Sequence, residues 1–214
     1  LRLRQQYFLS AASIGDIVQN HLSTYGTLEN LPDKEAIQLN DTHPTLAIPE
    51  MMRILLDECG FGWDKSFNIC QKVFSYTNHT VMAEALEKWN VDIFKMTLPR
   101  IYQIVVEMDR RAREELAKAF PGDQGKIDYM ALIGDNQVRM ANICAYTANS
   151  INGVSKLHSE IIKESVFHDY YLFKPNAFKN VTNGIAYRRW LLASNPGLCK
   201  LLDETIGDGY KHDA

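Results

Sequence analysis

The chain has 214 residues, of which 23 are Lys or Arg and 26 are Asp or Glu, so its formal net charge is −3. This balance excludes a basic nucleic-acid-binding surface and a polybasic membrane anchor. Because 46% of the residues are apolar and 10% are aromatic, the chain can bury a core, which excludes global disorder.

Apolar residues at helical spacing predict a series of helices along the chain. We expect them over residues 2–21, 45–59, 63–72, 81–89, 99–120 and 138–148, then up to about 163, and again from about 188. Two short apolar segments, 36–39 and 72–76, predict strands. An aromatic-rich loop is expected over 167–178, and the i,i+4 charge pairs of 99–120 predict a solvent-exposed face.

The cysteines and the first residue bear on the origin of the chain. The four cysteines, Cys59, Cys70, Cys144 and Cys199, form no Cys-x-x-Cys pair and predict buried, reduced thiols in a cytoplasmic protein. No signal peptide and no apolar run of about 20 residues is present, so no membrane association is expected. The start at Leu1, directly inside a helical pattern, suggests a piece of something longer.

Candidate site residues follow the two predicted strands. Each strand ends in a polar cluster with a histidine, Asp41 with His43 and Asn78 with His79, and a helix is expected next. In an open α/β sheet, ligands bind beyond the carboxyl ends of the strands. A carboxylate that orients a histidine leaves its other nitrogen for a ligand hydroxyl. These side chains suit a sugar, but their spacing alone is more typical of turns and helix caps that serve local backbone groups.

The sequence motifs of several other chemistries are absent. There is no Gly-x-Gly-x-x-Gly, P-loop, His-Glu-x-x-His or Gly-x-Ser-x-Gly sequence. No pair of histidines has helical metal spacing, so no metal is expected, and His158 is interpreted as a packing or surface residue. A metal-dependent hydrolase built from Asp41, His43 and His79 remains as a minor alternative.

Six blocks in order carry a family resemblance, and they are 36–44 (AIQLNDTHP), 76–80 (YTNHT), 84–89 (EALEKW), 152–154 (NGV), 158–161 (HSEI) and 182–191 (TNGI followed by RRWL). Over essentially the whole chain they resemble the central part of glycogen, starch and maltodextrin phosphorylases. The run 138–144 is similar to the bacterial branch.

The resemblance implies a fold and an activity. These phosphorylases are pyridoxal-phosphate enzymes with two Rossmann-like domains of the GT-B glycosyltransferase type, and they use phosphate to release glucose 1-phosphate from an α-1,4-glucan. The chain would then be a helix-rich, partial α/β domain: 1–181 is the C-terminal part of the first domain, and 182–214 is the crossover and first helix of the second. The whole enzyme would be allosteric, with a homodimer as its expected assembly.

The resemblance also implies residue roles at the sugar. His79 is expected to be catalytic, binding the glucosyl 6-hydroxyl and helping to stabilise the oxocarbenium-like transition state through its backbone carbonyl. Asn183 would bind the same hydroxyl, Val154 would pack near it, and Asp41 would orient His79.

Four further residues complete the expected site. His43 would lie on the pocket wall with Glu84 and Glu87 behind it, and Trp190 would lie close to the cofactor. Because no lysine here has the family's Gly-Asn-Met-Lys context, no covalently bound pyridoxal phosphate is expected on this chain. The family's glycine-rich loop and basic phosphate-binding cluster are also missing. The isolated chain is therefore predicted to be inactive, and the alternative is a carbohydrate-binding or regulatory paralogue without catalysis.

Overall fold

A computed structural model of the chain describes residues 1–212. They fall into two compact units, 1–181 and the residues from Thr182 onward. The assignment of these units to two domains of an enzyme stays a prediction. Within the described part of the chain, no helix combines the length and the apolar character needed to cross a membrane.

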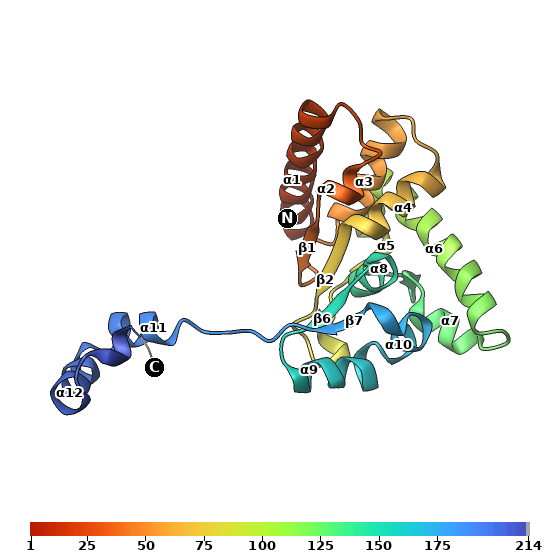
Figure 1. Cartoon of the computed structure of the whole chain (residues 1–214). Coiled ribbons are helices and arrows are strands. Elements are labelled where there is room, and N and C mark those ends of the chain that lie inside the picture. The colour runs from red at the N-terminus through yellow and green to blue at the C-terminus, as the bar shows by residue number, and fades with distance from the viewer. Residues whose placement is uncertain (213–214) are drawn as a thin grey trace. The chain divides into compact units, whose positions relative to one another are not determined.

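A four-stranded parallel sheet forms the centre of the first unit (Figure 1). Its strands are β1 (Ile37–Asn40), β2 (Phe74–Thr77), β6 (Ile151–Gly153) and β7 (Phe178–Asn180), in the order β1-β2-β6-β7. Because every pair is parallel, all four carboxyl ends lie at one edge of the sheet, and each connection returns through helices.

The first unit contains ten α-helices. They are α1 (Arg2–Tyr25), α2 (Leu31–Lys34), α3 (Ala47–Arg53), α4 (Trp63–Val73), α5 (Val91–Thr97), α6 (Pro99–Ala119), α7 (Gln124–Met130), α8 (Met140–Thr147), α9 (Lys156–Ile161) and α10 (His168–Phe173). Helices α3 and α9 continue directly into π-helical turns, over Ile54–Glu58 and Ile162–Val166. The long helices α1 and α6 match the sequence prediction closely.

The predicted helix over 81–89 is wrong. Only a 3₁₀ turn, Ala83–Ala85, forms there, and the chain then enters strand β3 (Lys88–Asn90). This strand pairs antiparallel with β5 (Gln137–Arg139), which also pairs with β4 (Ile133–Gly134). The partner strand lies almost fifty residues away, so local periodicity carried no signal of it.

Five strands and four helices of the first unit were not predicted, namely β3 to β7 and α2, α5, α7 and α10. β6 and β7 have three residues each, too short for an alternating pattern, and β6 contains the Asn152-Gly153 pair that was interpreted as an interruption. Helix α10 and the 3₁₀ turn Pro175–Ala177 occupy the segment expected to be an aromatic loop.

The sheet has one apolar face and one polar face. Leu39, Phe74, Tyr76 and Ile151 are at most 1% exposed and form the centre of the core. Alternate residues point the other way, as expected for a strand period of two. On that opposite face lie polar side chains, those of Gln38, Asn40, Ser75, Thr77 and Asn152.

The polar face of α6 contains ion pairs. Arg111 Nε lies 2.7 Å from Glu107, and Arg113 Nε lies 2.9 Å from Asp109, as the i,i+4 spacing predicts. Glu114, however, pairs with Arg110 rather than with Lys118.

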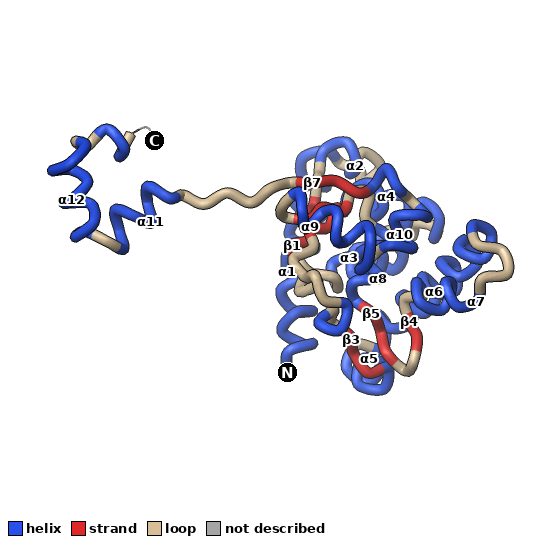
Figure 2. The backbone as a smooth tube through the Cα atoms, turned by 90° about the horizontal axis from the view of Figure 1, so that it is seen from below, coloured by secondary structure: helices blue, strands red, loops and turns tan. Residues whose placement is uncertain are grey.

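The second unit is a short helical segment (Figure 2). It contains α11 (Tyr187–Ser194), α12 (Pro196–Ile206) and a 3₁₀ turn, Gly209–Lys211. Asn195 separates the two helices, and its side-chain oxygen accepts the Leu198 N–H at 3.1 Å, which caps α12.

Candidate functional site

The candidate site lies where β1, β2 and β6 end (Figure 1). Three segments leave the sheet there, residues 40–43, 78–80 and 154–158. Hydrogen bonds join the strands just before these ends: Gln38 Nε2 donates to Thr77 Oγ1 at 2.8 Å, and Thr77 Oγ1 donates to Asn152 Oδ1 at 2.8 Å. These bonds fix the relative register of the three segments.

The chain turns sharply after β1. Asp41 has a left-handed backbone (φ 67°), its N–H donates to the Thr77 carbonyl at 2.9 Å, and its carboxylate accepts the Thr42 N–H at 2.7 Å. A left-handed conformation is uncommon for residues other than Gly, and Asp tolerates it because its side chain can bond locally. Asp41 therefore caps its own turn, as the turn-and-cap alternative expected.

His79 follows β2 and is exposed. Its Nε2 lies 2.5 Å from Asn40 Oδ1, so Nε2–H donates to the amide oxygen. The hydrogen-bond partner of His79 in the structure is thus Asn40, whereas the family resemblance implied Asp41. In the neutral ring this bond leaves Nδ1 as an acceptor, and no described residue hydrogen-bonds to it.

The main chain beside His79 is held from both sides. Asn78 is fully buried, and its Oδ1 accepts the Thr80 N–H at 3.0 Å. In a trans peptide, the C=O and N–H groups point in opposite directions. The bond from Asn78 to Thr80 therefore directs the His79 carbonyl away from Asn78.

Val154 follows β6 and lies close to the same segment. Its N–H donates to His158 Nδ1 at 3.1 Å, and His158 Nε2 lies 3.3 Å from the Thr80 carbonyl. His158 is buried, with 6% exposure, and so joins two strand ends. Its interpretation as a packing or surface residue missed this bridge.

Glu87 is the most connected of the predicted site residues. Its carboxylate accepts hydrogen bonds from Gln6 (2.8 Å), Thr42 (3.1 Å) and Trp89 (3.1 Å), so it ties α1 and β3 to the turn after β1. Glu84, in contrast, is exposed in the 3₁₀ turn.

A cavity of about 370 Å³ opens between these segments. Asp41, His43 and Glu87 all line it, and Arg2 lies beside His43, with its Nη2 3.4 Å from His43 Nδ1. Thr80, next to His79, lines it too. The structure thus gathers three predicted residues around one cavity. Asn183 and Trp190 belong to the second unit, where both are exposed, and their predicted roles stay predictions.

The hydrolase alternative finds no support in this geometry. Among residues 1–212, no group of three or more His, Cys, Asp or Glu side chains is arranged to hold a metal ion. The four cysteines are unpaired, and all but Cys59 are buried.

Comparisons with known proteins identify the family. The family model described as carbohydrate phosphorylase matches residues 1–214. The chain is 48% identical to the glycogen phosphorylase of Bacillus subtilis over 98% of its length, and 46% identical to the brain-form glycogen phosphorylase of Rattus norvegicus over all of it. The chain belongs to the carbohydrate phosphorylase family. It spans about a quarter of these relatives, 26% of the first and 27% of the second.

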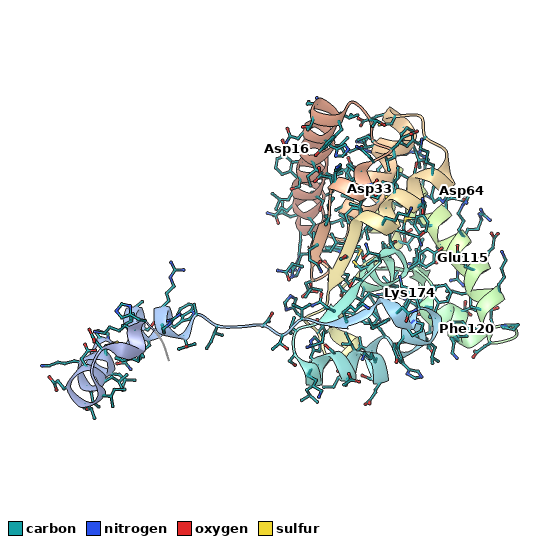
Figure 3. All side chains as sticks on the ribbon, in the orientation of Figure 1. Asp16, Asp33, Asp64, Glu115, Phe120 and Lys174 are labelled. Carbon is teal, nitrogen blue, oxygen red and sulfur yellow. The ribbon has the colours of Figure 1, made fainter. Side chains whose placement is uncertain are left out.

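Covalent attachment of pyridoxal phosphate requires a lysine that can form a Schiff base, and Lys174 is the buried candidate. Burial lowers the pKa of the Lys174 ammonium to about 7, while nearby Glu115 opposes the shift (Figure 3). A neutral lysine could form a Schiff base. However, Lys174 Nζ donates to the carbonyls of Tyr146 (2.9 Å) and Ala148 (2.8 Å), so it caps the end of α8 instead. Lys174 therefore does not fit a covalent pyridoxal-phosphate site.

Three residues at the strand ends contact the candidate site, and their contacts were not predicted from the sequence. Asn40 and His158 were not assigned to the site, and Asn78 was noted only as a neighbour of His79. A signal existed for Asn40, because it follows Gln38 at the polar positions of an alternating strand. His158 lies in the block 158–161 that carries the family resemblance, but no spacing pattern pointed to its partners, which are 4 and 78 residues away.

Proposed function

We propose that this chain is a segment of an α-glucan phosphorylase and forms one wall of its glucosyl site. The complete enzyme would transfer a terminal α-1,4-linked glucosyl unit to inorganic phosphate and release glucose 1-phosphate. The relatives in the comparison are glycogen phosphorylases, which supports this class of reaction. A cytoplasmic location, allosteric control and a homodimer belong to the same proposal.

The hydrogen bond between His79 and Asn40 is the observation that carries the proposal. It places a proton on Nε2, so that Nδ1 of the exposed imidazole is an acceptor when the ring is neutral. A neutral acceptor suits a sugar hydroxyl, which must be recognised by directional hydrogen bonds. In this proposal Nδ1 accepts from the 6-hydroxyl of the glucosyl unit, and Asn183 binds the same hydroxyl.

The backbone of His79 has a second proposed task. Its carbonyl is directed by the bond from Asn78 to Thr80, so it can act as a preorganised dipole. Such a dipole stabilises positive charge that develops at the sugar ring in an oxocarbenium-like transition state. Val154 and His43 would complete the wall, with Glu87 bracing it through its three bonds.

The proposal expects no turnover from the 214-residue chain itself. Phosphate must be held by preorganised cations, and the 370 Å³ cavity is lined by only two basic side chains other than histidine, Arg2 and Lys88. In this proposal, pyridoxal phosphate, which would supply proton transfer to the substrate phosphate, is held elsewhere in the polypeptide. Trp190 would lie near it.

A chimaera tests the proposal. This chain replaces the matching 26% of the Bacillus subtilis glycogen phosphorylase, and phosphorolysis of an α-1,4-glucan is measured. We expect activity in the chimaera, and a loss of at least about a hundredfold with His79→Ala. His168→Ala, an exposed histidine on α10, is the matched control and should retain full activity.

The paralogue alternative makes a different prediction. If the chain is a carbohydrate-binding module, calorimetry will show oligosaccharide binding to the isolated 214 residues, and the chimaera will be inactive although folded. That pair of results would replace the phosphorylase proposal.

A further inference from the structure

We propose that His158 is a positioning residue of the glucosyl site, which holds the His79–Thr80 segment in place against Val154. The inference rests on the proposed function, because His79 is the residue that it would serve. It assigns His158 no contact with the sugar.

The hydrogen bonds define the state of the His158 ring. Since Nδ1 accepts the Val154 N–H at 3.1 Å, the single ring proton lies on Nε2, which donates to the Thr80 carbonyl at 3.3 Å. The position of the ring is also fixed, because the His158 N–H donates to Ser155 Oγ at 3.0 Å at the start of α9. The side chain is 6% exposed, so water does not readily replace these bonds.

The two bonds at Thr80 act together on His79. Asn78 holds the Thr80 N–H, and His158 holds the Thr80 carbonyl, so both peptide groups of Thr80 are fixed. The first of these groups contains the His79 carbonyl. Removal of the His158 bond releases the second group, and the segment that carries His79 can then rotate away from its position beside Asn40.

A purely structural role would be typical of a buried histidine, and His21 provides the comparison. It is 1% exposed, and its ring bonds to Glu35 (3.1 Å) and Asn30 (2.9 Å). These partners lie around α1 and α2 rather than at the strand ends. His21→Phe is therefore a matched control that removes two buried hydrogen bonds without touching the site.

The first test uses the 214-residue chain and does not depend on catalysis. Amide NMR signals are compared in the unsubstituted chain, His158→Phe and His21→Phe, at temperatures where all three are folded. We expect His158→Phe to shift or broaden the signals of His79, Thr80 and Val154, and His21→Phe to leave them unchanged. Unchanged signals in His158→Phe would overturn the inference.

The second test uses the active chimaera. His158→Phe should lower kcat by about tenfold or more with a smaller change in KM, because misplacement of a group that acts in the transition state reduces turnover. His158→Gln, whose amide can still donate toward Thr80, should recover part of that loss. Equal kcat values for His158→Phe and the unsubstituted chimaera would refute the positioning role, and so would an equal loss in His21→Phe.

The two tests separate the inference from the proposed function. An inactive unsubstituted chimaera counts against the proposed function, and the amide signals then decide about His158 alone. An active chimaera with an unaffected His158→Phe variant leaves the proposed function in place and removes the positioning role.

Discussion

Gly153→Ala should destabilise the first unit and disturb the candidate site at once. Gly153 is the last residue of β6, and the start of α9 lies against it. A Cβ atom at this position would lie 2.7 Å from Ser159 Oγ, 2.8 Å from Ser159 N and 2.9 Å from Ser159 Cα. Two of these three atoms are backbone, so a rotamer change of Ser159 cannot relieve the overlap.

The size of the effect follows from these distances. Carbon atoms pack at about 3.5–4.0 Å, so α9 must move away by roughly half an ångström or more. Overpacking of this kind costs about 1–3 kcal/mol. The movement also strains the bonds of Ser159 Oγ to Asn180 Oδ1 and to the Ser155 carbonyl, both 2.8 Å. For a chain of this size, the melting temperature should fall by about 2–12 °C.

Calorimetric melting of three variants checks the reasoning. Gly15→Ala is the matched control, since a Cβ there meets nothing within 4 Å and the residue lies inside α1. It should raise the melting temperature, because Gly in a helix costs about 0.5–1 kcal/mol relative to Ala. Ser159→Ala added to Gly153→Ala should restore little stability. Full restoration by that second change, or no loss in Gly153→Ala, would refute the backbone-contact argument.

Three further predictions concern single side chains. The pKa of Lys174 is lowered to about 7 in the folded chain, while an unfolded lysine keeps its proton to about pH 10, so the unfolding free energy should rise with pH between these values. Lys174→Met should remove this rise, as measured by urea titrations at pH 6.5 and 9.5. An equal rise in Lys174→Met and the unsubstituted chain would contradict the prediction. Glu87→Ala should lower the unfolding free energy by about 2–4 kcal/mol, because three hydrogen-bond donors lose their acceptor. The control is Glu84→Ala at an exposed position, which should change the unfolding free energy by less than about 0.5 kcal/mol in the same urea titration. Burial raises the pKa of the Cys144 thiol to about 12, so iodoacetamide at pH 8 should leave Cys144 unmodified in the folded chain. The half-buried Cys59 should be modified first, which mass spectrometry of the labelled chain measures. Early labelling of Cys144 would contradict this order.

The sequence predicted those elements that carry their own periodicity. Helices α1 and α6 each have an apolar stripe over about five turns or more, and their bounds were close to those observed. The short apolar segments followed by polar clusters also located the carboxyl ends of β1 and β2, although no α-helix follows β2 directly. In contrast, β6 and β7 are defined by their pairing with β2 and with each other, and three residues cannot show a period.

The hydrogen-bond partner of His79 is the neutral Asn40 and not the charged Asp41, so the charge of a side chain did not predict the contact. The family resemblance implied that Asp41 orients His79, yet the left-handed backbone of Asp41 turns it out of the strand and its carboxylate bonds to the next N–H. Asn40 is the last residue of β1 and shares a face with Gln38. The contacts repeat at the strand period, Gln38 with Thr77 and Asn40 with His79.

The same contacts follow from the parity of the residues, that is, from which face of the sheet each residue occupies along its strand. In the segments Ile-Gln-Leu-Asn and Phe-Ser-Tyr-Thr, apolar residues alternate with polar ones, and Asn40 and His79 both fall on the polar parity. Residues of one parity on neighbouring parallel strands lie on one face of the sheet. Asp41 has the opposite parity, so it could orient His79 only if the strand were distorted before its end. Parity therefore selects Asn40 over Asp41, although the carboxylate is the stronger acceptor.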